Sequence, residues 1–248
     1  MIIIKSEDEI KRVADACRIV AEALDGIKKL IAPEITTIEL ERFVESFIKG
    51  RGATPAFKGY RGYPASLCVS INEQVVHGIP NSTKLKEGDI VSLDLGVYYK
   101  GFYGDAAATF PVGKIDDVAR KLITVTEDAL LRGIGCAVGG GRLFDISAAI
   151  QEYVEGNGFS VVRKFTGHGI GRELHEEPQV PNFGRRGEGP ILMPGMTLAI
   201  EPMVNVGHWE VIILDDGWTA VTKDGSLSAH FEHTIAITED RPMTLTEL

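Results

Sequence analysis

The stretch IVSLDLGVYYKGFYGDAAATF (residues 90–110) predicts a β-hairpin that carries two acidic side chains in a largely apolar setting. Apolar and small residues dominate both sides of the Lys-Gly pair at 100–101, which suits a two-residue turn. Such a turn pairs Asp94 with Ala107 across the hairpin. Asp105 then lies diagonally opposite Asp94 on the same sheet face, with Cβ atoms less than about 8 Å apart. A one-residue bulge would instead put the two carboxylates on opposite faces.

The segments around this hairpin repeat one order, in which two helices precede antiparallel strands. Ser6 and Glu9 form a capping-box pattern at the first helix start, and Thr37 suits the N-cap of the second. Helical spacing predicts helices at 6–30, 37–48, 117–133 and 145–154, and apolar runs predict further strands at 66–71, 161–165, 197–206, 210–214, 219–222 and 230–238. We therefore expect an α+β fold made of two related halves.

The composition is that of an ordinary globular chain. Its 248 residues are 44% hydrophobic and 25% charged. This predicts one domain over residues 1–248, whose hydrophobic core is large enough to be stable without disulfides or a structural metal. A net charge of −9 argues against broad binding of a phosphate backbone. The three cysteines form no CxxC pair, and no apolar run has the roughly 18 residues of a membrane span. A soluble cytoplasmic enzyme is the expectation.

Two more acids interrupt apolar segments, Glu201 in TLAIEPMVNV and Glu232 in HFEHTIAIT. Any one of these acids could simply face solvent, but a buried carboxylate must be paired, protonated or bound to a metal. His168 lies between glycines in FTGHGIGRELHEEP and offers a nitrogen ligand. Four carboxylates and one imidazole suit two bridged divalent ions, and this oxygen-rich set favours Mn²⁺, Fe²⁺, Co²⁺ or Mg²⁺ over structural Zn²⁺. The pattern predicts a dinuclear metal hydrolase.

The ordered set Asp94, Asp105, His168, Glu201 and Glu232 resembles the five metal ligands of the methionine aminopeptidases. The sequence segments around these residues resemble that family as well, over about residues 4 to 240. They are GYRGYPASLCVSINEQVVHGIP, DIVSLDLG, GFYGDAAATF, GHGIGRELHEEP, MTLAIEPM and HFEHTIAIT. The sequence is most similar to the short bacterial form of type I. It has neither a cysteine-rich N-terminal extension nor the long second-half insertion of type II.

This resemblance implies the pita-bread fold, in which two pseudo-symmetric α/β halves with antiparallel sheet surround a dinuclear site. It also implies removal of the initiator methionine when the next residue is small. Asp94 and Asp105 would bind one ion and His168 with Glu201 the other, while Asp105 and Glu232 bridge the pair. The ions would be Co, Mn, Fe or Zn. Glu201 would take the proton of the attacking water.

The resemblance further assigns His77 and His175 to hydrogen bonds with the scissile amide and the developing oxyanion. It implies a methionine pocket whose soft, aromatic and apolar walls suit a thioether, lined by Phe57, Tyr60, Tyr63, Cys68, Leu174 and Trp218. Phe57 stands where the family commonly has cysteine, and Leu174 where it has phenylalanine, so we expect the two residues to exchange volume across the pocket. Asn72 and Ser228 resemble contributors to a monovalent-cation site. From the residues alone, His208, His230 and His233 receive no role.

Two alternatives remain. A proline-specific relative, aminopeptidase P or prolidase, would share the fold and the five ligands, but these enzymes usually carry a further N-terminal domain. A metal-free pita-bread protein that only binds partners would have lost ligands, and here all five are present. We expect a monomer that acts on the N-termini of nascent chains, with transient ribosome contact and no nucleic-acid specificity or membrane anchor.

Overall fold

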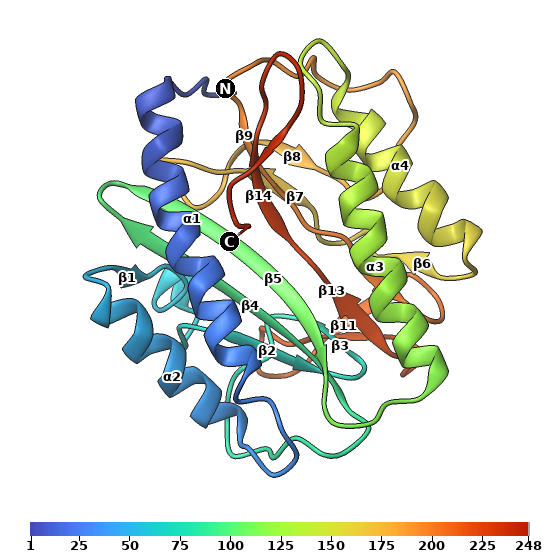
Figure 1. Ribbon diagram of the computed structural model, residues 1–248. Helices are drawn as coiled ribbons and strands as arrows, with labels where there is room; N and C mark the ends of the chain where they lie inside the picture. Colours follow the sequence, from blue (N-terminus) through green and yellow to red (C-terminus); the bar gives the residue numbers. More distant parts are fainter. Residues whose placement is uncertain (248) are drawn as a thin grey trace.

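Two pairs of helices flank a set of antiparallel strands. The structure, a computed structural model, describes residues 1–247. Figure 1 shows one helix pair on each side of the strands. The helices are α1 (Glu7–Lys28), α2 (Thr37–Gly50), α3 (Asp117–Gly135) and α4 (Leu143–Gly156). The predicted α+β order of two helices followed by strands, repeated once, is confirmed.

Local side-chain bonds set the helix starts. The Ser6 hydroxyl accepts from the backbone N–H of Glu9, and the Glu9 carboxylate accepts from that of Ser6, so the predicted capping box is confirmed. Thr36, one residue earlier than predicted, is the N-cap of α2. The predicted start of α4 at Asp145 was also wrong. The Asp145 carboxylate accepts from the backbone N–H of Arg142, which makes Arg142 the N-cap.

The first-half sheet is built on the predicted hairpin. Its strands are β1 (Thr54–Pro55), β2 (Cys68–Ile71), β4 (Ile90–Tyr99) and β5 (Phe102–Pro111). The register pairs Asp94 with Ala107 and Gly96 with Asp105 without interruption, so the predicted turn is confirmed and the bulge is not. Gly104 lets β5 lie against α1, because a Cβ there would be 2.6 Å from the backbone nitrogen of Cys17.

The predicted long strands at 197–206 and 230–238 are each broken in the middle. The first becomes β9 (Thr197–Ile200) and β10 (Met203–Asn205), and the second becomes β13 (Ser228–His230) and β14 (His233–Ala236). At the same level, both strands leave one sheet, where β9 pairs with β14, and enter another, where β10 pairs with β13. We call the break, residues 201–202 and 231–232, the crease. Pro202 favours it because proline has no N–H for a sheet ladder.

The remaining strands are short. The prediction of a strand at 161–165 was wrong beyond its first residue. The observed β6 (Ser160–Val161) ends there because its partner β10 begins only after Pro202. The other strands are β3 (Gln74–Val76), β7 (Gly167–Gly169), β8 (Glu176–Val180), β11 (Val211–Ile213), β12 (Ala220–Thr222) and β15 (Met243–Thr244). All six of these, like β6 and β1, are either unpredicted or shorter than predicted, because pairing with distant segments defines them.

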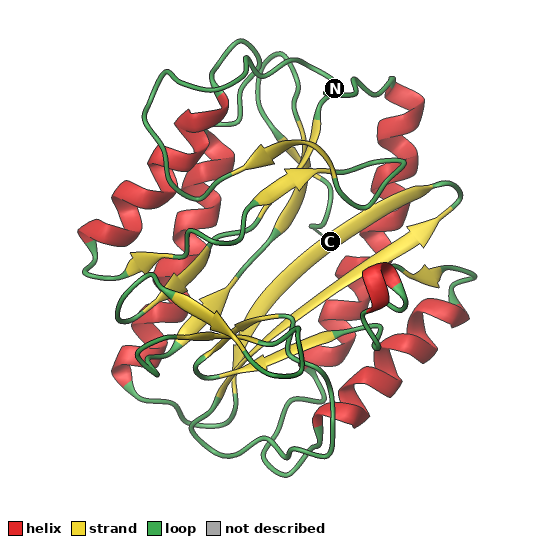
Figure 2. Cartoon of the chain, turned by 180° about the vertical axis from the view of Figure 1, so that it is seen from behind, coloured by secondary structure: helices red, strands yellow, loops and turns green. Residues whose placement is uncertain are grey.

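Each half has its own large hydrophobic core, and a seam joins the two. One core draws on residues 19–112 and the other mainly on residues 115–237. At the seam, the backbone N–H of Glu232 donates to the Ala107 carbonyl at 2.8 Å, and the Thr234 hydroxyl donates to the Asp105 carbonyl at 2.7 Å. Figure 2 shows the long β4–β5 hairpin crossing diagonally between the helix pairs. Within residues 1–247, no helix is long and apolar enough to cross a membrane.

Candidate metal centre and substrate pocket

One pocket gathers the metal, catalytic and methionine-binding residues predicted from the sequence. It has a volume of about 660 Å³ when the solvent in its open mouth is included. Residues from both halves line it: Phe57, Tyr60, Arg61, Tyr63, Cys68, His77, Asp94, Asp105, His168, Leu174, His175, Glu201, Trp218 and Glu232. Asn72 and Ser228 do not line it. Folding therefore brings together positions that are widely separated in the chain.

The acidic residues come from two structural devices. Asp94 and Asp105 project from the β4–β5 hairpin, whose observed register puts them diagonally on one face. Glu201 and Glu232 lie in the crease, where the chain leaves both sheet ladders. Buried oxygen atoms of three of these acids, Asp94 Oδ1, Asp105 Oδ1 and Glu232 Oε1, have no hydrogen-bond partner among residues 1–247. Such buried acceptors need a donor, a proton or a cation.

The pKa values of the four acids also indicate that these carboxylates need a proton or a cation. Burial raises the pKa of Asp94 to about 7. Burial and the charge of Asp94 hold the pKa of Asp105 well above its usual range. Burial together with the neighbouring carboxylates does the same for the pKa values of Glu201 and Glu232. Four charged carboxylates this close and this buried repel one another, and a divalent cation between them would reverse that interaction.

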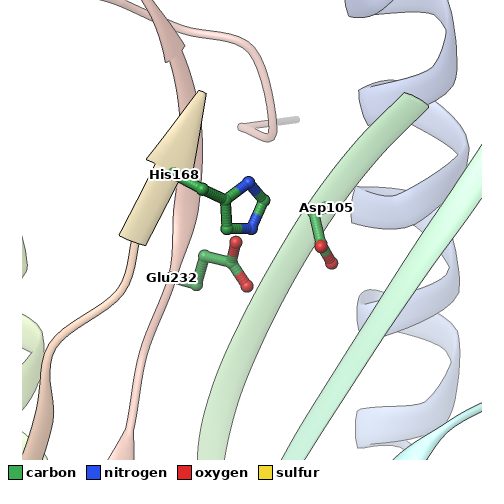
Figure 3. A group of neighbouring side chains, drawn as sticks. All are labelled: Asp105, His168 and Glu232. Atoms are coloured by element: carbon green, nitrogen blue, oxygen red, sulfur yellow. The ribbon is translucent and has the colours of Figure 1, made fainter. Parts of the chain in front are cut away.

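His168 supplies a nitrogen ligand to this acidic group. Its Nδ1 donates to the Gly169 carbonyl at 2.9 Å, which leaves the lone pair on Nε2 free. Burial lowers the pKa of His168 to about 4, so the ring is neutral, as a metal ligand must be. One ligand atom each of Asp105, His168 and Glu232 lies within 4.8 Å of the others. Figure 3 shows these three side chains and the elements that carry them. Glu201 Oε1 is 3.6 Å from His168 Nε2.

His77 and His175 lie at the edge of this centre. His77 has a φ of 61°, a strained conformation for a residue other than glycine, and such strain is typical of functional sites. Its ring packs edge-on against Phe165, at 5.4 Å between centroids. The ring of His175 lies 4.1 Å from that of His168, and its Nδ1 is 3.0 Å from the Tyr60 hydroxyl. Both side chains line the pocket, where each could present a ring nitrogen to a bound peptide.

The apolar end of the pocket is a separate hydrophobic cluster. Phe57, Tyr63, Cys68 and Leu174 are buried in it, and Tyr60 and Trp218 pack against it. Tyr63 meets Trp218 edge-on at 5.2 Å and donates its hydroxyl to the Gly78 carbonyl at 2.9 Å, which fixes this wall. Phe57 and Leu174, the two unusual residues, belong to the same cluster.

The sequence reasoning missed two residues here. Arg61 lines the pocket in a left-handed conformation, with φ of 50°, and its guanidinium lies 5.3 Å from the centre of the Tyr60 ring. The flanking glycines of GYRGYP were the available signal. His230, which had been given no role, places Nε2 3.8 Å from Glu201 Oε2. No short motif marks it. Asn72 and Ser228, predicted to contribute to a monovalent-cation site, contact each other. The backbone carbonyl of Asn72 accepts from the backbone N–H of Ser228 at 2.9 Å.

Comparison with known proteins identifies the family. The profile of metallopeptidase family M24 matches residues 11–239. The chain belongs to this family. A methionine aminopeptidase of Clostridium perfringens is 58% identical over 99% of both chains. The solved methionine aminopeptidase of Thermotoga maritima is 51% identical, with a TM-score of 0.98 over 100% of both chains.

A more distant solved structure is the Xaa-Pro dipeptidase of Bacillus anthracis, 26% identical with a TM-score of 0.81. The match covers 99% of this chain but only 62% of the dipeptidase chain. The predicted resemblance to methionine aminopeptidases and the pita-bread fold are confirmed, and membership of M24 makes the chain a metal-dependent hydrolase. The proline-specific alternative shares the fold but is much less similar in sequence.

Proposed function

We propose that this M24 enzyme removes the N-terminal methionine from nascent proteins and peptides whose second residue is small. The observation that carries the proposal is the direct contact of two environments in one pocket. Buried acids and His168 form one end, and the soft apolar cluster around Cys68 and Trp218 forms the other. A peptide with its first side chain in the cluster would place its first carbonyl beside the acids. The full-length relatives at 58% and 51% identity have this activity in their names.

The residues present fit a pair of divalent ions. Ligand atoms of Asp105, His168 and Glu232 lie within 4.8 Å of one another, and Asp94 lines the same pocket. Among residues 1–247, a buried oxygen of Asp94, of Asp105 and of Glu232 has no hydrogen-bond partner. Asp94, Asp105, His168, Glu201 and Glu232 would hold the ions, which we expect to be Co, Mn, Fe or Zn. When bound, the ions would polarise the peptide carbonyl and make a water molecule nucleophilic at neutral pH.

The chain's own residues do the remaining work. Glu201 accepts the proton of the attacking water, since its carboxylate lines the pocket beside His168. His77 and His175 donate hydrogen bonds to the scissile amide and to the carbonyl oxygen as negative charge develops there. Tyr63 and Trp218 form a rigid wall that excludes water from the thioether and sets the position of the first residue.

Several finer expectations accompany this proposal. Residues 1–248 would act as a single catalytic domain and as a monomer in the cytoplasm. The protein would act on nascent chains while it contacts the ribosome transiently. Asn72 and Ser228 would contribute to a monovalent-cation site. The net charge of −9 fits a protein without nucleic-acid specificity.

The test combines metal analysis with two peptides. Purified chain is loaded with Co²⁺ or Mn²⁺, its ions are counted by elemental analysis, and hydrolysis of a Met-Ala peptide is compared with that of an Ala-Pro peptide. We expect two ions per chain and release of methionine only. Preferential cleavage of Ala-Pro would favour the prolidase alternative, and a chain that binds no ion would favour a partner-binding protein.

A further inference from the structure

His230 is a buried side chain with no role in the reaction described so far. It lies on β13, two residues before Glu232, and is 1% exposed. Its Nε2 has no hydrogen-bond partner among residues 1–247. A carboxylate oxygen, Glu201 Oε2, lies 3.8 Å from this nitrogen. A buried imidazole nitrogen aimed at a buried carboxylate needs an explanation, because unpaired buried polar groups are rare.

Hydrogen bonds from both halves of the molecule hold the backbone of His230 in place. Its N–H donates to the hydroxyl of Thr109 at 2.9 Å, and the same hydroxyl lies 2.8 Å from its carbonyl oxygen. Thr109 also bonds Ser92 within the β4–β5 hairpin, at 2.8 Å. On the other side, His230 pairs with Met203 of β10, just after the crease. Both halves of the molecule therefore hold this residue in place.

Glu201 lies between two histidines that offer it different chemistry. Oε1 faces His168 Nε2 at 3.6 Å, and Oε2 faces His230 Nε2 at 3.8 Å. His168 already donates its ring proton from Nδ1 to Gly169, so its Nε2 is an acceptor and cannot bond the carboxylate. His230 has no such commitment at Nε2. Only this second histidine can donate to Glu201.

We propose that His230 is a positioning residue, whose Nε2–H donates a hydrogen bond to Oε2 of Glu201 and so turns Oε1 toward His168 and the bound ions. The 3.8 Å separation exceeds a normal hydrogen bond, so the two atoms have to approach by about 0.8 Å when the bond forms. This role rests on the proposed metal function. A metal-ligating carboxylate held by a second hydrogen bond is a common arrangement, and its loss typically weakens metal affinity 10- to 100-fold.

The proposal predicts a split between kinetic constants. Glu201 is both a ligand and the proton acceptor, whereas methionine binds in the hydrophobic cluster away from His230. Loss of the hydrogen bond should therefore lower kcat and leave KM for a Met-Ala peptide within about twofold. A merely structural role would lower thermal stability without this split or a change at the metal.

The experiment compares H230L, which cannot donate, with H230Q, whose amide can. H208L, which changes an exposed histidine, is the matched control. Co²⁺ affinity is measured by calorimetry and the Co²⁺ coordination by visible absorption, both without peptide. We expect at least a tenfold weaker second Co²⁺ ion and an altered spectrum in H230L, near wild-type behaviour in H230Q, and no change in H208L.

Three results would overturn the proposal: wild-type Co²⁺ affinity and spectrum in H230L, loss of an ion in both H230L and H230Q, or no Co²⁺ bound by the wild type. The second would make His230 a ligand. Because these readouts need no peptide, failure to cleave Met-Ala would count against the proposed function alone.

A second measurement uses the unchanged protein, in case H230L does not fold. Side-chain ¹H–¹⁵N spectra of the Zn²⁺-loaded chain should show His230 as the Nε2–H tautomer, with its proton protected from exchange. The Nδ1–H tautomer would overturn the proposal, since Nε2 would then have no proton to give.

Discussion

At the scale of single residues, the metal centre depends on buried carboxylate oxygens that have no hydrogen-bond partner among residues 1–247. Asp94 and Asp105 lie on one face of a hairpin whose register is uninterrupted, yet each has a buried carboxylate oxygen that finds no hydrogen-bond partner among residues 1–247. Each such oxygen would cost stability in a chain that had no ion to bind. A metal site thus trades the stability of the empty fold for affinity toward the cation.

The first prediction follows from this trade. Asp105→Asn keeps the shape of the side chain but removes the charge that would bridge the ions. We expect loss of at least one ion and of more than 99% of the activity, because a shared ligand is lost. The melting temperature of the metal-free variant should not fall below that of the metal-free wild type, since repulsion with Asp94 is relieved.

Elemental analysis and calorimetry check this prediction. Asp215→Ala, which removes an exposed acid in a turn, is the control. It should change neither the number of bound ions nor their affinity. Retention of two tightly bound ions in Asp105→Asn would contradict the ligand assignment.

The second prediction concerns pH. Burial raises the pKa of Asp94 to about 7, so near pH 6 this carboxyl holds a proton that a cation must displace. Near pH 8 it is mostly ionised already. Apparent affinity for Mn²⁺ should therefore rise between these two pH values, and binding should release fewer protons from Asp94 at the higher one. Isothermal titration in buffers of different ionisation enthalpy measures both. An affinity independent of pH would show that no ligand titrates in this range.

At the scale of elements, close approach of backbone to backbone positions the hairpin. Gly104 has no side chain between β5 and α1, and an added Cβ would be 2.6 Å from the Cys17 nitrogen. Gly104→Ala should therefore push the helix from the sheet and cost about 1–3 kcal/mol. In contrast, Gly135→Ala in α3 meets no atom within 4 Å and should gain a few tenths to about 1 kcal/mol. Urea unfolding of both variants checks the opposite signs; equal effects would refute the contact argument.

A buried ion pair holds the loop that carries His175. Lys5 pairs with Glu176, and both side chains are 2% exposed. The Glu176 carboxylate also accepts from the backbone N–H groups of Arg172 and Glu173, so it organises the loop from within.

Lys5→Met would leave this buried carboxylate without its cation and should destabilise the fold by about 3–5 kcal/mol. Activity should fall as the loop loosens. Lys11→Met is the control, because the Lys11–Asp8 pair is exposed and contributes little. Denaturant titration of the two variants measures the difference, and similar midpoints would show that the Lys5 pair is not structural.

The elements also show what a sequence can and cannot reveal. The register of the β4–β5 hairpin was predictable because a two-residue turn fixes it locally. The crease was not, because apolar runs on both sides of Glu201 and Glu232 look continuous, and only sheet pairing with distant strands divides them. The site residues were named mostly through a family resemblance, and their chemical roles stay predictions. His230 carries no local signal at all, since its importance depends on the position of Glu201.

At the scale of the whole molecule, the exposed N-terminus provides a test of specificity on the chain itself. The sequence begins Met1-Ile2, and Met1 is fully exposed. Isoleucine is β-branched and bulky, so under the small-residue rule Met1 should remain when the protein is made in a cell. Intact-mass measurement checks this, and a panel of Met-Ala, Met-Gly, Met-Ile and Met-Leu peptides checks the rule. Efficient release of methionine from Met-Ile would indicate a broader aminopeptidase.

The seam between the halves has a further consequence. Asp94 and Asp105 belong to the first half, whereas His168, Glu201 and Glu232 belong to the second. Ions held by both sets would act as a reversible cross-link between residues 94 and 232, which closes a loop of more than half the chain. Long loops are entropically the most demanding to close, so such a cross-link restrains the unfolded chain most strongly. Supply of the cation would then govern how long the protein survives proteolysis as well as how fast it works.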